Sequence, residues 1–360
     1  MRVAQVCPRF YPDIGGVETH VYEISKRLAK HFEIEVLSTD PGGRYLKVEK
    51  VDGFTVKRFK SIAPSNSYYF SLDMYRFLKK HSSDYNILHA HNYHAFPALF
   101  ASLTKSKNKL IFTPHYHGKG HSFIRDLLHR PYKIPGKRIF EKADAVICVS
   151  KFEKEIILKN FNMDSSKIFV IPNGVNLDEF KCVEKIKEQK DRNIKIILYV
   201  GRIEKYKGLD YVVKALKYLP KNFVLEVVGR GSYKSKIVKL ARNLGIINRI
   251  RFYWDLNRDE LIEKYAKADL LVLLSKYEAY GLVVAEALAS KTPCIVANTS
   301  ALSEWIDNEN VFGIDYPIDI RRLVRLIINV SEIEIKNISV QNWVYIAEQI
   351  KNIYMQLMEK

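Results

Sequence analysis

Short apolar runs alternate with amphipathic segments along most of this chain. Each run is strand-sized and rich in β-branched side chains, and the stretches between runs carry apolar residues at helical spacing. In the first half, a helical pattern spans residues 17–31, and apolar runs lie at residues 2–7, 33–38, 87–91, 110–113, 145–149 and 168–171. Regular alternation of strand and helix predicts a parallel sheet wound with helices.

The same rhythm starts again in the second half. Residues 178–193 are charged and contain no strand-like run, which predicts a linker there. The new apolar runs lie at residues 194–200, 223–228, 250–253, 270–274 and 294–297, with a helical pattern at 209–219. We therefore predict an α/β fold of two Rossmann-like lobes, residues 1–175 and 176–342, with a ligand cleft between the carboxyl ends of facing sheets.

The end of the chain, residues 343–360, contains neither Gly nor Pro. Its apolar residues include Ile346, Ile350, Ile353, Tyr354 and Leu357. This spacing predicts a helix with one buried face.

Length and composition agree with two domains. With 360 residues and a hydrophobic content of 47%, the chain can form more than one packed core. No apolar run approaches the roughly 18 to 20 residues that span a bilayer. The N-terminus shows no signal-peptide pattern, so we expect a cytoplasmic protein. The four cysteines form no C-x-x-C pair, which argues against a zinc ribbon and against a disulfide scaffold.

The formal net charge of +18 is unevenly distributed. Residues 1–172 carry 28 Lys and Arg against 16 Asp and Glu, whereas residues 173–360 carry 30 against 24. The first half should therefore attract an anionic partner. Residues 119–138 hold six basic side chains and one acid, with apolar residues between them. Such a segment can lie on an anionic membrane surface, or it can be a helix that packs its apolar side on the lobe.

Residues 270–289 carry the most informative chemistry. A buried strand ends in a polar loop with Glu278, Gly281 opens a helix, and Glu286 follows on that helix. A helix start offers free N–H groups to a diphosphate, and a carboxylate further along can accept two hydrogen bonds from a ribose diol. Two isolated glutamates at a helix end would more often be solvated surface residues.

Two other turns have the order of elements that an anion site requires. Gly201 and Arg202 follow a strand, and Lys207 precedes a helix. Two cations at that position can neutralise a pyrophosphate leaving group without a metal. Gly15 and Gly16, between the first strand and the first helix, would let the backbone approach a ligand closely, although tight turns also favour glycine for structural reasons.

These residues together resemble the retaining glycosyltransferases of family four, which have the GT-B double-Rossmann architecture. The matching segments, in chain order, are GGVETHV, TPH, VIPNGVNLDEF, VGRIEKYKGLD, VVGRG and EAYGLVVAEALA. The spacing of Glu278 and Glu286 is the E-x7-E pattern typical of that family. The resemblance implies that both parallel sheets face an interdomain cleft and that the helix at residues 343–360 returns to the first lobe.

Carried over motif by motif, the resemblance implies a donor site in the second lobe. Arg202 and Lys207 would hold the donor diphosphate, and Glu286 would hold the ribose. Glu278 and the backbone near Tyr280 would hold the donor sugar. The other donor-binding residues that the motifs supply are Gly15, Gly16, Gly229, Gly281 and Leu282.

The resemblance also implies which residues act in catalysis. His115, in the segment TPH after a strand, matches the family's active-site histidine, which would lie beside the reacting sugar. The catalytic candidates are therefore His115 and Glu278, and we add His91 and Asn92 as candidates on the acceptor side.

All ten histidines lie before residue 130. Two groups stand out, His89, His91 and His94, and His115, His117 and His121. Histidine groups can bind zinc, but no carboxylate or cysteine completes a ligand set here. We therefore expect no metal site and no cofactor.

Other functions fit parts of the pattern. A basic protein with a vestigial transferase site could bind an anionic surface, but no nucleic-acid motif occurs and the charged donor-site residues are intact. A nucleotide-sugar epimerase or a phosphorylase with similar lobes would differ in its reaction, because an epimerase acts on the donor alone and a phosphorylase consumes phosphate.

We expect an enzyme that is a retaining, metal-independent hexosyltransferase. It would move glucose or mannose from a nucleotide-diphosphate sugar to a glycan or lipid-linked glycan, in the synthesis of cell-surface glycans or N-glycosylation precursors. A lipid-linked acceptor and the basic segment favour a peripheral position on the cytoplasmic membrane face. The chain departs from the family at Trp254, where Gly is frequent, and at residues 299–301, where a glycine pair is frequent. These departures leave the choice of base and sugar open.

Overall fold

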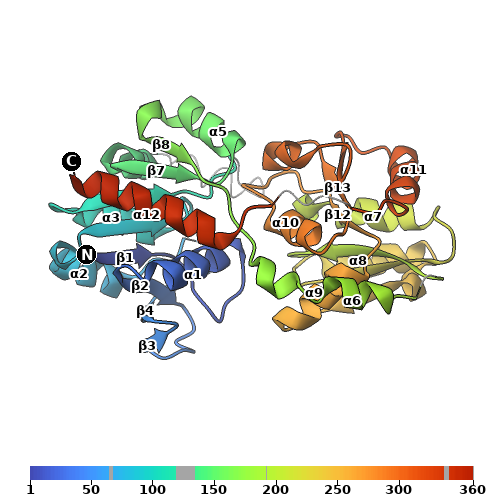
Figure 1. Cartoon of the computed structure of the whole chain (residues 1–360), viewed down its shortest axis with the longest axis horizontal. Helices are drawn as coiled ribbons and strands as arrows, with labels where there is room; N and C mark the ends of the chain where they lie inside the picture. The colour runs from blue at the N-terminus through green and yellow to red at the C-terminus, as the bar shows by residue number, and fades with distance from the viewer. Residues whose placement is uncertain (65–67, 119–133, 192, 336–339, 360) are drawn as a thin grey trace. The chain divides into compact units, whose positions relative to one another are not determined.

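The computed structural model of this chain describes residues 1–64, 68–118, 134–191, 193–335 and 340–359. They form two compact units, one made of Met1–Asn173 with Trp343–Lys360 and the other of Gly174–Asn342 (Figure 1). Each unit contains its own sheet, and helices pack against that sheet. In the described part of the chain, no helix is both long enough and apolar enough to cross a bilayer.

The described sheet of the first unit has eight strands, in the order β3-β4-β2-β1-β5-β6-β7-β8. Neighbouring strands are parallel except β3 and β4. β5 and β7 are buried along their whole length, as expected where helices cover both faces of a parallel sheet. The strands are β1 (Arg2–Val6), β2 (Glu33–Asp40), β3 (Val48–Val51), β4 (Phe54–Lys60), β5 (Ile87–His91), β6 (Lys109–Thr113), β7 (Ala145–Cys148) and β8 (Ile168–Val170).

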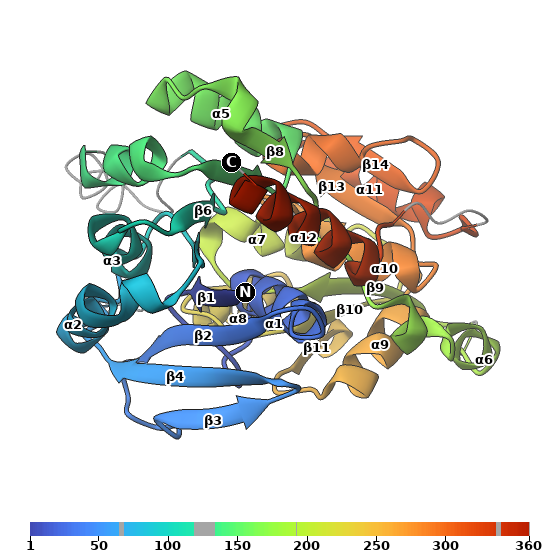
Figure 2. The same ribbon diagram turned by 60° about the vertical axis from the view of Figure 1, so that its left-hand side comes forward.

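The C-terminal helix belongs to this first unit. The helices of this unit with both ends in the described residues include α1 (Gly16–Leu28), α2 (Leu72–His81), α3 (Phe96–Thr104), α5 (Lys151–Phe161) and α12 (Trp343–Glu359). α12 packs beside α1, and α2 packs beside α3 (Figure 2). The buried Tyr354 of α12 accepts a hydrogen bond from Gln5 Nε2 of β1 at 3.0 Å. The prediction of an α/β chain with two units built on largely parallel sheets, whose last helix returns to the first unit, is confirmed.

The second unit has a described sheet of six strands in the order β11-β10-β9-β12-β13-β14, all parallel to their neighbours. The strands are β9 (Lys195–Val200), β10 (Phe223–Val228), β11 (Ile250–Tyr253), β12 (Leu270–Leu273), β13 (Cys294–Ala297) and β14 (Val311–Ile314). The helices are α6 (Val183–Glu188), α7 (Leu209–Leu216), α8 (Lys234–Asn243), α9 (Arg258–Lys267), α10 (Leu282–Ala289) and α11 (Ile320–Val330). Its core is made of aliphatic residues of the central strands, such as Ile197, Leu225 and Val272, together with the inner faces of α7 and α11.

Several helices of both units begin at a side chain that caps them. Ser150 Oγ accepts the Glu153 N–H at the start of α5, and Asp319 caps α11 in the same manner. Asn257 and Glu260 form a reciprocal capping box at the start of α9. These contacts satisfy N–H groups that a helix start leaves without intrahelical partners.

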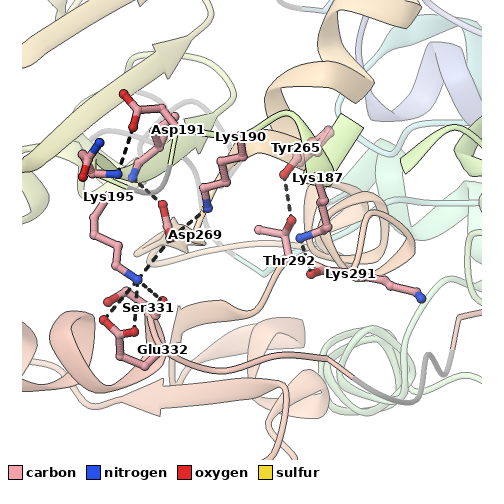
Figure 3. A network of polar contacts seen from close by, with 12 residues as sticks. Lys187, Lys190, Asp191, Lys195, Tyr265, Asp269, Lys291, Thr292, Ser331 and Glu332 are labelled. Carbon is pink, nitrogen blue, oxygen red and sulfur yellow. Dashed lines mark hydrogen bonds and ion pairs between the residues drawn. The ribbon is translucent and has the colours of Figure 1, made fainter. Parts of the chain in front are cut away.

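The charged stretch that the sequence suggested as a linker is instead part of the second unit. Phe180 and Val183 are buried against α9 and α10, and α6 packs along α9. Lys190 Nζ lies 2.7 Å from Asp269 Oδ1, and Lys187 Nζ donates to the Lys291 carbonyl at 2.9 Å (Figure 3). The prediction of a linker within residues 178–193 was wrong, because this segment is fixed to the unit by two apolar side chains and by its lysines.

In both units the order of strands reverses at one point of the sheet. In the second unit the chain builds outward from β9 through β10 to β11, then returns to place β12 on the other side of β9. In the first unit the same reversal separates β1 from β5. The carboxyl ends of the two strands at such a reversal leave a crevice where open α/β sheets bind ligands.

Candidate active site

The loops at the reversal point of the second unit carry several of the predicted donor residues, among them Arg202, Lys207 and Glu278. Gly201 and Arg202 follow β9, and Glu278 lies in the loop after β12. Lys207 ends a short 3-10 turn before α7, and its Nζ donates to Glu278 Oε1. The fold therefore brings Lys207 and Glu278 together as an ion pair, although they stand 71 positions apart in the sequence.

The environment of Lys207 keeps it charged. Burial alone would lower the pKa of its ammonium group, but the adjacent Glu278 carboxylate outweighs burial and raises that pKa above its usual value. A cation whose charge is fixed in this way can attract the diphosphate of a nucleotide sugar.

The second predicted cation, Arg202, is exposed at the end of β9. Its Nη2 donates to the Tyr206 hydroxyl at 2.8 Å, and its carbonyl accepts a hydrogen bond from the Tyr199 hydroxyl at 2.7 Å. Two tyrosines thus hold the loop, while the guanidinium keeps other N–H donors for an anion.

The loops after β9 and β10 touch at glycines. Gly229 has a φ of +142°, and a Cβ there would lie 2.1 Å from the carbonyl oxygen of Gly201. Any side chain would force these loops apart. Gly229 therefore sets the position of Arg202 through the backbone, whether or not it also contacts a ligand.

The start of α10 lies beside this cluster. Gly281, with a φ of +97°, is its N-cap and supplies no capping side chain, which leaves backbone N–H groups of the first turn for an anion. The Tyr280 carbonyl accepts a hydrogen bond from Trp305 Nε1 at 2.8 Å. Ser300, in the segment that departs from the family pattern, accepts the Glu278 N–H at 3.0 Å. The backbone on both sides of the helix start is thus held by side chains of the following segment.

Glu286 is buried on α10 and already has two partners. Arg258 Nη1 lies 2.5 Å from its Oε1, and the Tyr265 hydroxyl donates to its Oε2 at 2.9 Å. Arg258 also pairs with Glu179 at 2.7 Å. Each carboxylate oxygen can accept a further hydrogen bond, so a ribose diol can still bind Glu286 in an orientation that Arg258 and Tyr265 fix.

In the first unit, Gly15 and Gly16 begin α1, as predicted. A Cβ on Gly15 would lie 2.4 Å from Glu18 Oε2, and the Glu18 carboxylate lies 2.7 Å from Arg9 Nη2. A Cβ on Gly16 would meet no described atom within 4 Å. The close Glu18 carboxylate therefore explains why residue 15 is a glycine, whereas Gly16 has open space in which a ligand could lie.

His115 and Asn92 have unusual backbone conformations at strand ends. His115 follows β6 with a φ of +50°, and Asn92 follows β5 with a φ of +71°. Non-glycine residues in this region are uncommon and cluster at functional sites. The buried carboxyl group of Glu153 holds the residue after His115, because its two oxygens accept the Tyr116 N–H at 2.5 Å and the Val149 N–H at 2.7 Å. Burial raises the pKa of Glu153 to about 8.

Sequence reasoning missed a third histidine at this edge of the sheet. His20, on α1, lies with its ring centroid 5.1 Å from that of His115 and 5.5 Å from that of His91. The group at His89, His91 and His94 is divided, since His89 instead bonds Tyr354 and Thr113. His94 stacks on His117, and His121 lies outside the described residues. The signal for His20 was present in the segment GGVETHV, but nothing in its spacing connects it with His91.

Burial lowers the pKa of all three clustered histidines. That of His20 falls to about 4, and those of His91 and His115 fall well below the ordinary value, with neighbouring imidazoles adding to the effect for both. They are therefore neutral at neutral pH, and each can accept a hydrogen bond or bind an electrophile through one nitrogen.

Comparison with known proteins identifies the family. Residues 14–179 match the family described as Glycosyltransferase Family 4, and residues 182–349 match the one described as Glycosyl transferases group 1. An uncharacterized glycosyltransferase of Methanocaldococcus jannaschii is 31% identical over 299 residues, which cover 77% of this chain and 75% of that protein. The chain is a group 1 glycosyltransferase. It is an enzyme that uses a nucleotide-sugar donor.

Other similarities of this glycosyltransferase extend over most of its length. The D-inositol 3-phosphate glycosyltransferase of Xylanimonas cellulosilytica is 27% identical over 329 residues, covering 81% of this chain and 77% of that one. Sucrose-phosphate synthase from Thermosynechococcus elongatus has a TM-score of 0.80 at 21% identity and covers 99% of both chains. Anabaena HepE in complex with UDP-glucose has a TM-score of 0.74 at 16% identity, covering 100% of this chain and 98% of that one. These structures share the fold of this glycosyltransferase, and the matched families do not favour an epimerase, a phosphorylase or a vestigial site.

Proposed function

We propose that this glycosyltransferase moves a hexose, glucose or mannose, from a nucleotide-diphosphate sugar to a glycan or lipid-linked glycan. The observation that carries the proposal is the cluster of Arg202, Lys207 and Glu278 beside the start of α10, at the strand reversal of the second unit. The cations and the free N–H groups at the start of α10 suit the diphosphate of a nucleoside diphosphate. The buried carboxylate of Glu286, on the same helix, suits its ribose.

Each donor-site residue has a role in this proposal. Arg202 and Lys207 bind the diphosphate and offset the charge that develops on it as the sugar leaves. Glu286 binds the ribose, and Arg258 orients Glu286. The N–H groups at Gly281 and Leu282 complete the anion site. Because protein groups supply this positive charge, the proposed reaction needs no divalent metal and no cofactor.

The proposed transfer retains the configuration of the sugar. The bond from the sugar C1 to the diphosphate oxygen breaks, and the acceptor hydroxyl forms the new C1–O bond on the same face. The departing phosphate oxygen takes the hydroxyl proton, so charge and atoms balance without a covalent enzyme intermediate. Glu278, which is paired with Lys207, binds the sugar rather than attacking it. We assign His115 to supporting the charge that develops on the sugar, and His91 and Asn92 to the acceptor side.

A donor-hydrolysis screen tests the proposal. The purified chain is incubated with UDP-, GDP- and ADP-linked glucose and mannose, and nucleoside diphosphate release is measured. The complex of HepE with UDP-glucose makes UDP-glucose the first donor to examine. The expected result is release from one donor, faster with added acceptor and with the anomeric configuration retained in the product. Inversion at C1 would refute the retaining mechanism. Consumption of inorganic phosphate would show that the enzyme is a phosphorylase and not a transferase.

We also propose that the enzyme is cytoplasmic and binds the anionic membrane surface through residues 119–138. Most of that segment, residues 119–133, lies outside the described residues, so the proposal rests on its sequence. Basic residues near an anionic leaflet contribute about 1 kcal/mol each. Flotation with anionic and neutral liposomes decides the matter. Binding to anionic vesicles alone, lost when Arg125, Arg130 and Lys133 are replaced together, supports the proposal, and failure to float with either vesicle type refutes it.

A further inference from the structure

Three histidines of the first unit bring ring nitrogens close together. His20 comes from α1, His91 ends β5 and His115 follows β6. One ring nitrogen of each lies within 4.8 Å of those of the other two. His20 and His91 are fully buried and His115 is partly buried.

Each of these histidines keeps one buried nitrogen that has no hydrogen-bond partner among the described residues. These atoms are His20 Nε2, His91 Nδ1 and His115 Nε2. Such atoms are costly to bury, and most buried polar atoms in folded proteins have a partner. Three of them on neighbouring rings therefore indicate a missing ligand.

The opposite nitrogens of two of the rings are already engaged. His20 Nδ1 lies 2.8 Å from Asn173 Oδ1, and His91 Nε2 lies 2.7 Å from Gln5 Oε1. An amide oxygen only accepts, so each imidazole must donate its N–H outward and present a lone pair at the nitrogen without a partner. The orientation of Gln5 is fixed in turn, because its Nε2 donates to the Tyr354 hydroxyl. Histidines that bind metals commonly donate their other N–H to such an oxygen.

A fourth imidazole, His89, lies 4.2 Å from His91 by ring centroid, but both of its nitrogens are hydrogen bonded. It therefore adds no ligand. The set is three neutral nitrogens.

The geometry favours an ion over a water molecule or a sugar hydroxyl. A single ion can bind three lone pairs at once, whereas a water molecule can donate only two hydrogen bonds and a hydroxyl only one. One ring nitrogen of each histidine lies within 4.8 Å of one nitrogen of each of the others, so some point lies within about 2.8 Å of one nitrogen of every ring. A zinc–imidazole bond is roughly 2.0 to 2.1 Å. Shifts of less than about 1 Å would therefore close the three ligands on one ion.

We propose that His20, His91 and His115 form a binding site for a divalent transition metal of the Zn²⁺ class, with Asn173 and Gln5 orienting two of the ligands. Three neutral imidazoles are a known zinc ligand set, which leaves a fourth position for a water or another oxygen ligand. Mg²⁺ and Ca²⁺ are excluded as occupants because they require oxygen ligands. The proposed transfer uses no metal, but the metal site shares His115 with it. An ion bound to His115 withdraws that side chain from the reaction, so the metal-loaded enzyme should transfer sugar more slowly.

Metal binding is tested directly on the full chain. Protein stripped with a chelator is dialysed against limiting Zn²⁺, and bound metal is measured by elemental analysis. Zn²⁺ affinity is measured by competition with a chromophoric chelator. Co²⁺ serves as a second probe, because its visible absorption reports the geometry of its ligands. The expected result is one equivalent per chain for wild type.

Three variants separate this site from adventitious binding. Asn173→Ala keeps all ligands but loses an outer hydrogen bond, and its Zn²⁺ affinity should fall by about 10- to 100-fold. His20→Gln loses a ligand, and its affinity should fall further. His81→Gln is the matched control, because His81 lies outside the cluster beside Asp84 on the surface and its loss should change nothing.

The outcomes are distinct. If wild type binds no Zn²⁺, or if His20→Gln and Asn173→Ala bind it as tightly as wild type, the site does not exist. Circular dichroism without metal checks that His20→Gln is folded, and if it is not, Asn173→Ala decides. The proposed function is judged separately on metal-free enzyme. Zn²⁺ inhibition that a chelator reverses supports the metal site, whereas inactivity without metal contradicts only the metal-independent mechanism.

Discussion

Lys207 and Glu278 form an ion pair that joins the loops after β9 and β12, the two strands that meet at the reversal of the second sheet. Without a donor, the Glu278 carboxylate, which we assign to the sugar, neutralises the charge of Lys207, which we assign to the diphosphate. A bound diphosphate would share Lys207 with Glu278. The pair thus couples recognition of the phosphate to the position of the group that faces the sugar.

The first prediction concerns this cation. Lys207→Ala removes a charge-assisted hydrogen bond to the diphosphate, worth about 1.5 to 3 kcal/mol, so nucleoside diphosphate affinity should fall by roughly 10- to 150-fold. Affinity is measured by calorimetry with the diphosphate that the donor screen selects. Lys205→Ala, an exposed lysine of the same turn, is the matched control and should bind as wild type. Equal affinities in all three proteins would exclude Lys207 from the phosphate site.

The second prediction concerns Glu286 and the ribose. Glu286→Ala should abolish the preference of the enzyme for a ribose diphosphate over its 2′,3′-dideoxy analogue, because the variant has lost the acceptor of both hydroxyl groups. Arg258→Ala should reduce this preference in part, since it leaves the carboxylate but removes its orienting partner. Competition binding of the two nucleotides measures the ratio. A preference that survives in Glu286→Ala would assign the ribose to another residue.

Some of this site could be predicted from the sequence, and the reason is local spacing. Glu278, Gly281 and Glu286 lie on one strand–loop–helix segment, so their relative positions follow from the chain itself. The pairing of Glu286 with Arg258 could not be predicted, because it depends on how α9 packs against α10. The linker prediction failed for a similar reason. Two apolar residues, Phe180 and Val183, do not make a recognisable helical pattern in a sequence. Only their burial shows that the segment belongs to the second unit.

The histidine cluster shows a second limit. His20, His91 and His115 meet because β1 lies beside β5 and β5 beside β6, with α1 packed over them. Sequence grouping favoured residues close in number, such as His89 with His91. These two lie two positions apart on β5, so they share one face of the strand with their ring centroids 4.2 Å apart, but His89 bonds Tyr354 whereas His91 bonds Gln5.

The third prediction concerns Glu153 as a positioning residue. Glu153→Ala removes the acceptor of the Tyr116 and Val149 N–H groups, so the strained conformation of His115 should relax. Turnover should fall by at least about 10-fold, as for the loss of a group that orients a catalytic residue. Nucleotide affinity, which belongs to the second unit, should not change. Glu153→Gln keeps one acceptor oxygen and should recover part of the turnover. A change in nucleotide affinity with unchanged turnover would contradict this role.

The fourth prediction is that catalysis does not need a metal. After chelator treatment, turnover should stay the same or rise, because Arg202, Lys207 and the start of α10 supply the positive charge at the leaving group. Turnover is measured before and after removal of metal, with the residual metal content determined on the same samples. Loss of turnover that Mg²⁺ or Mn²⁺ restores would show that the protein groups are insufficient.

The fifth prediction links His20 to the pH dependence of stability. In the unfolded chain its pKa is near 6.5, whereas burial lowers it to about 4 in the folded protein. Between these values the unfolded state binds more protons, so the free energy of unfolding falls as the pH is lowered through this window. The contribution of His20 is fully present above pH 6.5 and amounts to about 3 kcal/mol. His91 and His115 shift in the same direction and add to the slope.

Urea unfolding of metal-free protein at several pH values across this window measures that slope. Wild type should lose stability steadily as the pH falls, and His20→Gln, which cannot take up a proton, should lose clearly less. His81→Gln is the control and should follow wild type, because His81 lies outside the cluster, beside Asp84. If His20→Gln and wild type show the same slope, His20 is not held neutral by the fold.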